Sequence, residues 1–163
     1  MNTLFLLVFH IIGFSLMAGT TAVDFLCYSQ FWKQYAIDKR GGSAVLAVLS
    51  KFRFLFMIGF LLLLLSGIGM VVLSHGLFAA QAWFRIKMIF VLLIFLNGMI
   101  VGRRLAVKVR EGVAMEIAGN LPGTAILTSQ EHMAELKAKL RIFHIMQLLF
   151  FLCIFILSAY KFN

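Results

Sequence analysis

A few ionisable side chains interrupt the long apolar stretches of this sequence, and they are the residues that could carry chemistry. His10, Asp24, Lys87 and His144 all stand within such stretches. An ionisable group at the centre of a bilayer costs roughly 2.5–3.5 kcal/mol even on a lenient insertion scale, so it usually faces other helices and marks a functional site. We therefore expect these side chains to face the interior of a helix bundle.

The polar residues of the first apolar stretch recur at helical spacing and so share one face. That face carries His10, Gly13, Met17, Thr20, Thr21 and Asp24. A rise of 1.5 Å per residue separates its two ionisable groups by about 21 Å along the helix axis. The chemistry is therefore expected in two layers, an outer one with His10 and Lys87 and an inner one with Asp24.

The outer layer could hold a haem, because histidine is a common axial ligand of haem iron. A second ligand would have to lie at a similar depth, where Met70 and His75 are the candidates, whereas His144 lies near the opposite surface. His10 could equally be a hydrogen-bonded packing residue. Lys87 could equally be a charge that snorkels to the interface. The sequence leaves these alternatives open.

The inner layer combines Asp24 with two basic residues at the start of the second apolar stretch, Lys51 and Arg53. An ion pair between the carboxylate and one of these cations is the simplest interpretation, since a charge within a membrane helix usually has a partner. A proton relay through Asp24 is the alternative.

Composition identifies the elements that must position these side chains. Of the 163 residues 63% are hydrophobic and only 13% are charged, and the mean hydropathy is +1.01, which is too apolar for a water-soluble domain. A bilayer core about 30 Å thick needs roughly 20 apolar residues per helix. The stretches 4–28, 54–73, 82–102 and 142–160 meet this requirement. We expect an all-α integral membrane four-helix bundle that forms a single domain over residues 1–163.

The basic residues are distributed unevenly between the two sides of the predicted bundle. Of the 15 Lys and Arg residues, only Arg85, Lys87 and Lys161 lie on the side of the termini. The positive-inside rule therefore predicts both termini outside, and the loops after the first and third helices in the cytoplasm, in a bacterial inner membrane. Mixed apolar and charged residues beyond the spans predict that the second, third and fourth helices extend into the cytoplasm.

Turn-forming residues predict where the chain reverses on the cytoplasmic side. Gly41-Gly42-Ser43 indicates the turn before the second helix, and the stretch 119–123, Gly-Asn-Leu-Pro-Gly, indicates the turn before the last. Thr128 and Glu131 fit a capping box, so the last helix is expected to begin near Thr128 and to run unbroken into its membrane span.

The net charge of the chain also indicates which classes of partner it could bind. The net charge of +9 follows from topology, and a nucleic-acid surface is excluded because the basic residues are not interleaved with aromatic residues on a soluble face. The lipid bilayer is the expected partner. A homo-oligomer or a membrane-complex partner stays open.

Several short motifs resemble those of a known family. They are His10-Ile-Ile-Gly13 and Met17-Ala-Gly19 in the first helix, Lys51 and Arg53 at the start of the second, Ser66-Gly-Ile-Gly69 at its end, and Trp83-x-x-x-Lys87 with Asn97-Gly98 in the third. This pattern covers roughly residues 4–104 and resembles the HemJ-type membrane protoporphyrinogen oxidases and the similar CopD-like membrane domains. The resemblance implies a b-type haem and functional roles for His10, Arg53 and Lys87. Asn97 stands where that pattern leads us to expect a second histidine.

The resulting hypothesis is a HemJ/CopD-like membrane protein that binds haem b or a porphyrin and supports oxidoreductase chemistry on it. His10 would be the metal ligand or proton acceptor, and Met70 is the candidate second ligand. Lys87 and Arg53 would pair with carboxylates of the cofactor or substrate. The alternative is a non-catalytic membrane subunit or a small transporter whose polar residues only hold the helices together.

Overall fold

Every element described in the computed structural model is a helix. The structure describes the backbone of residues 3–77, 80–118 and 123–159, and the side chains of these ranges except 123–130. The elements are α1 (Thr3–Ile37), α2 (Lys39–Leu73), α3 (Ala82–Leu96), the π-helical segment η1 (Asn97–Gly102), α4 (Arg103–Ile117) and α5 (Gly123–Ala159). Four helices are long and apolar enough to cross a membrane, α3, η1 and α4 together forming one of them. The prediction of four helical spans is confirmed.

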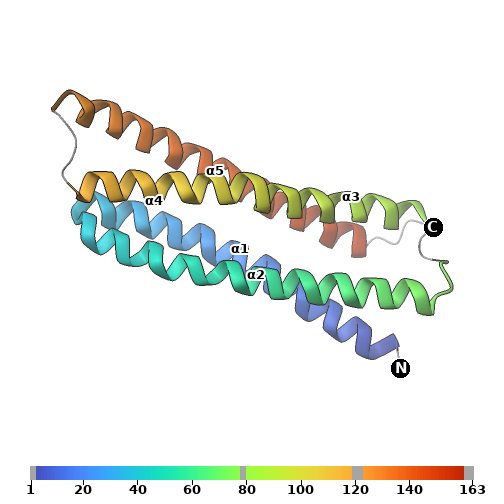
Figure 1. Cartoon of the computed structure of the whole chain (residues 1–163). Coiled ribbons are helices and arrows are strands. Elements are labelled where there is room, and N and C mark those ends of the chain that lie inside the picture. Colours follow the sequence, from blue (N-terminus) through green and yellow to red (C-terminus); the bar gives the residue numbers. More distant parts are fainter. Residues whose placement is uncertain (1–2, 78–79, 119–122, 160–163) are drawn as a thin grey trace.

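The four long helices form two layers (Figure 1). Helices α1 and α2 lie side by side and antiparallel, and α5 crosses the rod formed by α3, η1 and α4. α1 also packs on α5, and α2 packs on α4. Within the described residues α2 has no close backbone approach to α3, the helix that follows it. These two helices meet through side chains instead, since the rings of Phe60 on α2 and Phe95 on α3 stack with their centroids 4.3 Å apart.

Glycines allow α1 and α2 to approach closely. A Cβ atom added to Gly13 would lie 2.7 Å from the backbone nitrogen of Leu63 and 2.8 Å from the carbonyl oxygen of Gly59. Such small-residue contacts are typical of helix association in membranes, where van der Waals packing must replace the hydrophobic driving force. They fix the spacing of the two helices that carry His10 and Arg53.

The connection between α1 and α2 differs from the prediction. The predicted turn at 41–43 was wrong, because Gly41, Gly42 and Ser43 lie within α2 and the chain reverses at Asp38. The Asp38 carboxylate caps α2 by accepting hydrogen bonds from the backbone N–H groups of Arg40 (3.0 Å) and Gly41 (2.8 Å). The glycines serve packing instead, since a Cβ on Gly42 would lie 3.0 Å from Tyr35.

All four long helices exceed the thickness of a bilayer core. Helices α1 and α2 have 35 residues each, which corresponds to about 52 Å at 1.5 Å per residue against a core of about 30 Å. The first helix thus continues to Ile37, well past the predicted limit at residue 28. Helix α5 begins at Gly123 and not near Thr128, and it runs unbroken to Ala159 as expected. The rest of the predicted turn, 119–122, and the proposed capping side chain of Thr128 lie outside the described residues.

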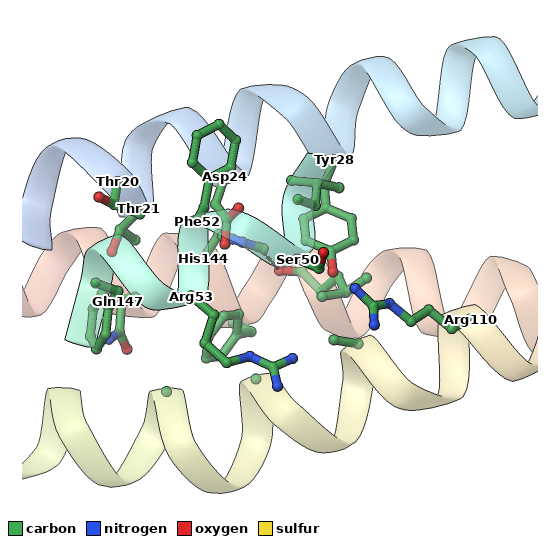
Figure 2. A pocket seen from close by; sticks show the side chains of 17 residues that line it. Thr20, Thr21, Asp24, Tyr28, Ser50, Phe52, Arg53, Arg110, His144 and Gln147 are labelled. Carbon is green, nitrogen blue, oxygen red and sulfur yellow. Dashed lines mark hydrogen bonds between the residues drawn. The ribbon is translucent and has the colours of Figure 1, made fainter. Parts of the chain in front are cut away.

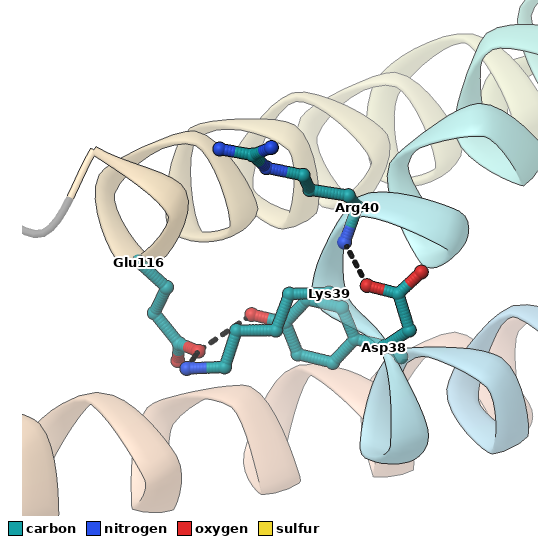
Figure 3. A network of polar contacts seen from close by, with 5 residues as sticks. Asp38, Lys39, Arg40 and Glu116 are labelled. Carbon is teal, nitrogen blue, oxygen red and sulfur yellow. Dashed lines mark hydrogen bonds and ion pairs between the residues drawn. The ribbon is translucent and has the colours of Figure 1, made fainter.

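Polar contacts join three helices at the end of the bundle where α1 meets α2 (Figure 3). Lys39 Nζ of α2 lies 3.0 Å from Glu116 Oε2 of α4, and Tyr35 of α1 donates a hydrogen bond of 2.7 Å to the same oxygen. The carboxylate of Glu116 therefore ties the α1–α2 pair to the end of α4.

A buried apolar layer crosses the middle of the bundle. It is formed by Met17, Leu63, Val91, Ile94, Phe151 and Ile154. On α1, Met17 lies between the levels of His10 and Asp24, so this middle layer separates the two polar layers predicted from the sequence.

Candidate functional site

The structure brings three predicted site residues together in one cavity. His10, Met70 and Lys87 line a cavity of about 480 Å³ between α1, α2, α3 and α5, and the other lining residues are mostly apolar. This volume lies within the range of about 300–1,000 Å³ that is usual for small-molecule sites. We call it the His10 cavity.

The hydrogen bonds of His10 fix its tautomer. His10 Nδ1 lies 3.0 Å from Ser66 Oγ. The Ser66 hydroxyl donates to the carbonyl oxygen of Leu62 at 2.6 Å, so its oxygen accepts from His10. Nδ1 therefore carries the proton and Nε2 carries the lone pair. A histidine whose Nδ1–H is held by a protein acceptor is oriented to ligate a metal through Nε2.

Lys87 supplies a positive charge to the same cavity. Its Nζ donates a hydrogen bond of 2.8 Å to Ser158 Oγ, and the Ser158 hydroxyl donates in turn to the carbonyl oxygen of Ile154 at 2.8 Å. Among the described residues that line the cavity, none is Asp or Glu. The ammonium group is thus held by a neutral oxygen and lacks a counter-charge in the cavity wall, which suits it to pair with a carboxylate of a bound molecule.

The other histidines lie elsewhere. His75, the alternative second ligand, is exposed in the turn after α2 and is not among the residues that line the His10 cavity, whereas Met70 is. His144 is 2% exposed and lines a second cavity. Of the candidate ligand pairs, His10 with Met70 is the one that shares a cavity.

The second cavity, whose lining side chains are drawn in Figure 2, has a volume of about 100 Å³. Asp24 of α1, Arg53 of α2, Arg110 of α4 and His144 of α5 all line it. We call it the Asp24 cavity. Arg53 was grouped by the resemblance with His10 and Lys87, but the structure puts it here, in a separate cavity from those two residues.

The predicted ion pair of Asp24 is not formed. Its Oδ1 is buried and has no hydrogen-bond partner in the described part of the chain, and no ion pair joins Asp24 to Lys51 or Arg53 there. Figure 2 shows the reason, since the Arg53 side chain extends from α2 toward the rod of α3, η1 and α4 and away from Asp24. The oxygen of Thr20, one turn earlier on α1, is also buried without a partner.

Sequence reasoning missed the contribution of the third long helix to this cavity. Gly98 and Gly102 of η1 line it, and π-helical segments are frequent at functional sites. Next to them Asn97 Nδ2 donates to Gln147 Oε1 at 2.8 Å, and Gln147 Nε2 donates to the carbonyl oxygen of Ile94 at 3.0 Å. The pair Asn97-Gly98 was the available signal, because a polar residue beside a glycine is unusual in the middle of a membrane helix.

Arg110 was also missed as a site residue, because the charge count used it only for topology. Leu105, Val109 and Val113 are the buried residues of α4 and mark its inner face. Arg110 follows Val109, and its Nη2 reaches back to the carbonyl oxygen of Leu46 on α2 at 3.5 Å. That contact holds its side chain at the Asp24 cavity.

Comparisons with known protein families, curated proteins and solved structures found no match to this chain.

Proposed function

We propose that this chain is a membrane protein that binds haem b or a porphyrin in the His10 cavity. The observation that carries the proposal is the pairing of His10 Nδ1 with Ser66, which leaves the Nε2 lone pair available to bind a metal, in a residue that lines a largely apolar cavity. His10 and Met70, both in the wall of this cavity, would hold the haem iron. Imidazole and thioether are both established haem ligands.

The lining of the cavity suits an amphiphilic ligand. Its apolar walls favour the faces and edges of a macrocycle, and the ammonium of Lys87 favours a propionate carboxylate. Haem supplies one-electron chemistry when bound, and the protein tunes it through ligand identity and burial. We assign no contact with this ligand to Arg53, because Arg53 lines the Asp24 cavity.

The proposal includes a location and an orientation. The asymmetry of the basic residues supports a bacterial inner-membrane protein with both termini outside, so that the His10 cavity lies in the outer leaflet and the joined ends of α1, α2, α4 and α5 project into the cytoplasm.

A second candidate is a non-catalytic membrane subunit or small transporter. It is favoured by the hydrogen bonds of His10 to Ser66 and of Lys87 to Ser158, since both side chains already have partners within the protein. An oxidase would require the His10 cavity to take up a porphyrin, whereas a structural subunit would not.

The absorption spectrum of the purified protein tests the proposal. The protein, alone or after addition of haemin, should give a Soret band that His10→Ala abolishes while the helical circular dichroism is unchanged. Lys87→Met should weaken retention of haem without removing the band, because its charge pairs with a carboxylate and not with iron.

His144→Ala is the matched control, since it removes another buried histidine from the same bundle but from the other cavity. It should leave the band in place. A colourless protein that takes up no haemin, or full absorbance in His10→Ala, contradicts the haem assignment and favours the structural subunit.

A further inference from the structure

Two guanidinium groups meet at the Asp24 cavity from different helices. Arg53 of α2 and Arg110 of α4 both line it together with Ser50, and Figure 2 shows both side chains extending toward the same part of the cavity. Within the described part of the chain neither arginine forms an ion pair with Asp or Glu. Arginine presents a rigid fork of donors that matches the oxygens of phosphate and carboxylate groups.

The charges that line this cavity do not balance. The ionisable groups that line the cavity together with Asp24 are Tyr28 on its own helix, Arg53 from α2, Arg110 from α4 and His144 from α5, while η1 contributes only glycines. Two permanent positive charges therefore share the cavity with one carboxylate. The surplus is positive even when Asp24 is ionised, and it attracts an anion.

Two buried oxygens in the same cavity also lack partners. They are Thr20 Oγ1 and Asp24 Oδ1. Buried polar atoms are nearly always satisfied by protein, water or ligand, and a cavity of about 100 Å³ has room for several waters or for one small oxyanion. When Asp24 is protonated it becomes a hydrogen-bond donor, and the cavity loses its only negative charge.

We propose that Arg53 and Arg110 form a phosphate-class oxyanion site whose occupancy is linked to protonation of Asp24. The oxyanion is either a free phosphate or the phosphate of a lipid headgroup, because both present the same tetrahedral group of oxygens to the two exposed arginines. Protonation of Asp24 removes a repulsive charge and so favours the anion. By linkage the bound anion favours the proton to the same extent.

Binding to the intact protein in phosphatidylcholine nanodiscs tests the site. Inorganic phosphate is titrated calorimetrically in one arm, and in the other phosphatidic acid is added to the nanodiscs and its retention is measured by native mass spectrometry. Binding in either arm supports the proposal and identifies the source of the oxyanion. Arg53→Gln and Arg110→Gln should each weaken it about tenfold or more, as expected for the loss of a charge-assisted hydrogen bond.

Arg104→Gln is the matched control, since it removes the same charge from an exposed position on α4 that does not line the cavity. It should change the affinity by less than about twofold. No binding in either arm, or an equal loss in Arg104→Gln, overturns the site. The Soret band should be unchanged in all three arginine variants, so a failure here is distinguishable from a failure of the haem proposal.

Sulfate tests the proton linkage, because its charge is constant across the physiological pH range. Its affinity for the native protein should rise as the pH falls, and Asp24→Asn should bind it roughly tenfold more tightly than the native protein at alkaline pH, with no pH dependence of its own. The pH dependence should persist in His144→Gln, which removes the histidine of the cavity. A pH dependence that is unchanged in Asp24→Asn, or lost in His144→Gln, overturns the linkage to Asp24.

Discussion

At the scale of single residues, Gln147 is the side chain that joins α5 to the π-helical segment. It is 1% exposed, accepts a hydrogen bond from Asn97 and donates one to the carbonyl oxygen of Ile94. Gln147→Leu should lower the free energy of unfolding by about 1 kcal/mol, the usual scale of interhelical hydrogen bonds in membranes. Unfolding in a denaturing detergent measures the change.

The double variant Asn97→Leu with Gln147→Leu separates this hydrogen bond from general loss of packing. If the two amides are hydrogen-bonded, the double variant should lose less free energy of unfolding than the two single variants lose in sum, because each single change already breaks the same contact. Strictly additive losses would show that the two amides contribute independently.

Residue types and spacing predicted the two polar layers but not the pairing within them. The helical face of His10 and Asp24 can be read from spacing alone, and the cavities of the structure follow it. The missing Asp24–Arg53 ion pair could not be foreseen, because a long side chain can turn toward either neighbouring helix. Arg110 escaped notice because a basic residue beyond a membrane span normally signals topology.

At the scale of elements, the close approach of α1 and α2 depends on Gly13. A Cβ there would meet the backbone of α2 at 2.7 Å, which only a shift of a helix can relieve. Gly13→Ala should therefore destabilise the protein by roughly 1–3 kcal/mol, the usual cost of overpacking. Gly19→Ala is the control on the same helix, since a Cβ there would meet nothing within 4 Å.

The melting temperature in detergent compares these two glycine variants. Gly19→Ala should stay within about 0.5 kcal/mol of the native stability, as exposed substitutions usually do. Equal melting temperatures for the two variants would mean that α1 and α2 are not held at the spacing described here.

Hydropathy predicted that four spans exist, but it did not predict where the helices end. It reports the stretch that lipid can surround, and α1 and α2 continue as helices well beyond that stretch to meet at Asp38. The glycines at 41 and 42 were misinterpreted as a turn, because close packing against Tyr35 and a chain reversal both require a small residue. The carboxylate cap at Asp38 was the better local signal.

At the scale of the whole molecule, the middle layer lies between the two cavities of the protein. Met17 and Ile94 belong to this layer and are each 1% exposed. Among the described residues, none lines both the His10 cavity and the Asp24 cavity. Chemistry in one cavity can then affect the other only through movement of the helices or through long-range charge.

The orientation of the bundle decides which compartment faces which side of the membrane. Only three of the 15 basic residues lie at the end with the termini, so a reporter fused after Asn163 should be active on the non-cytoplasmic side and one inserted at Gly123 should be active in the cytoplasm. Alkaline phosphatase and green fluorescent protein fusions at each of these two positions measure the orientation, because alkaline phosphatase is active outside the cytoplasm and green fluorescent protein fluoresces inside it.

Replacing Arg103 and Arg104 with Gln should lower the fraction of correctly oriented chains, since it removes charge next to a span. Fusions with the reverse activities would put the Asp24 cavity on the outer side, and its oxyanion would then come from the outer leaflet or the periplasm and not from the cytoplasm.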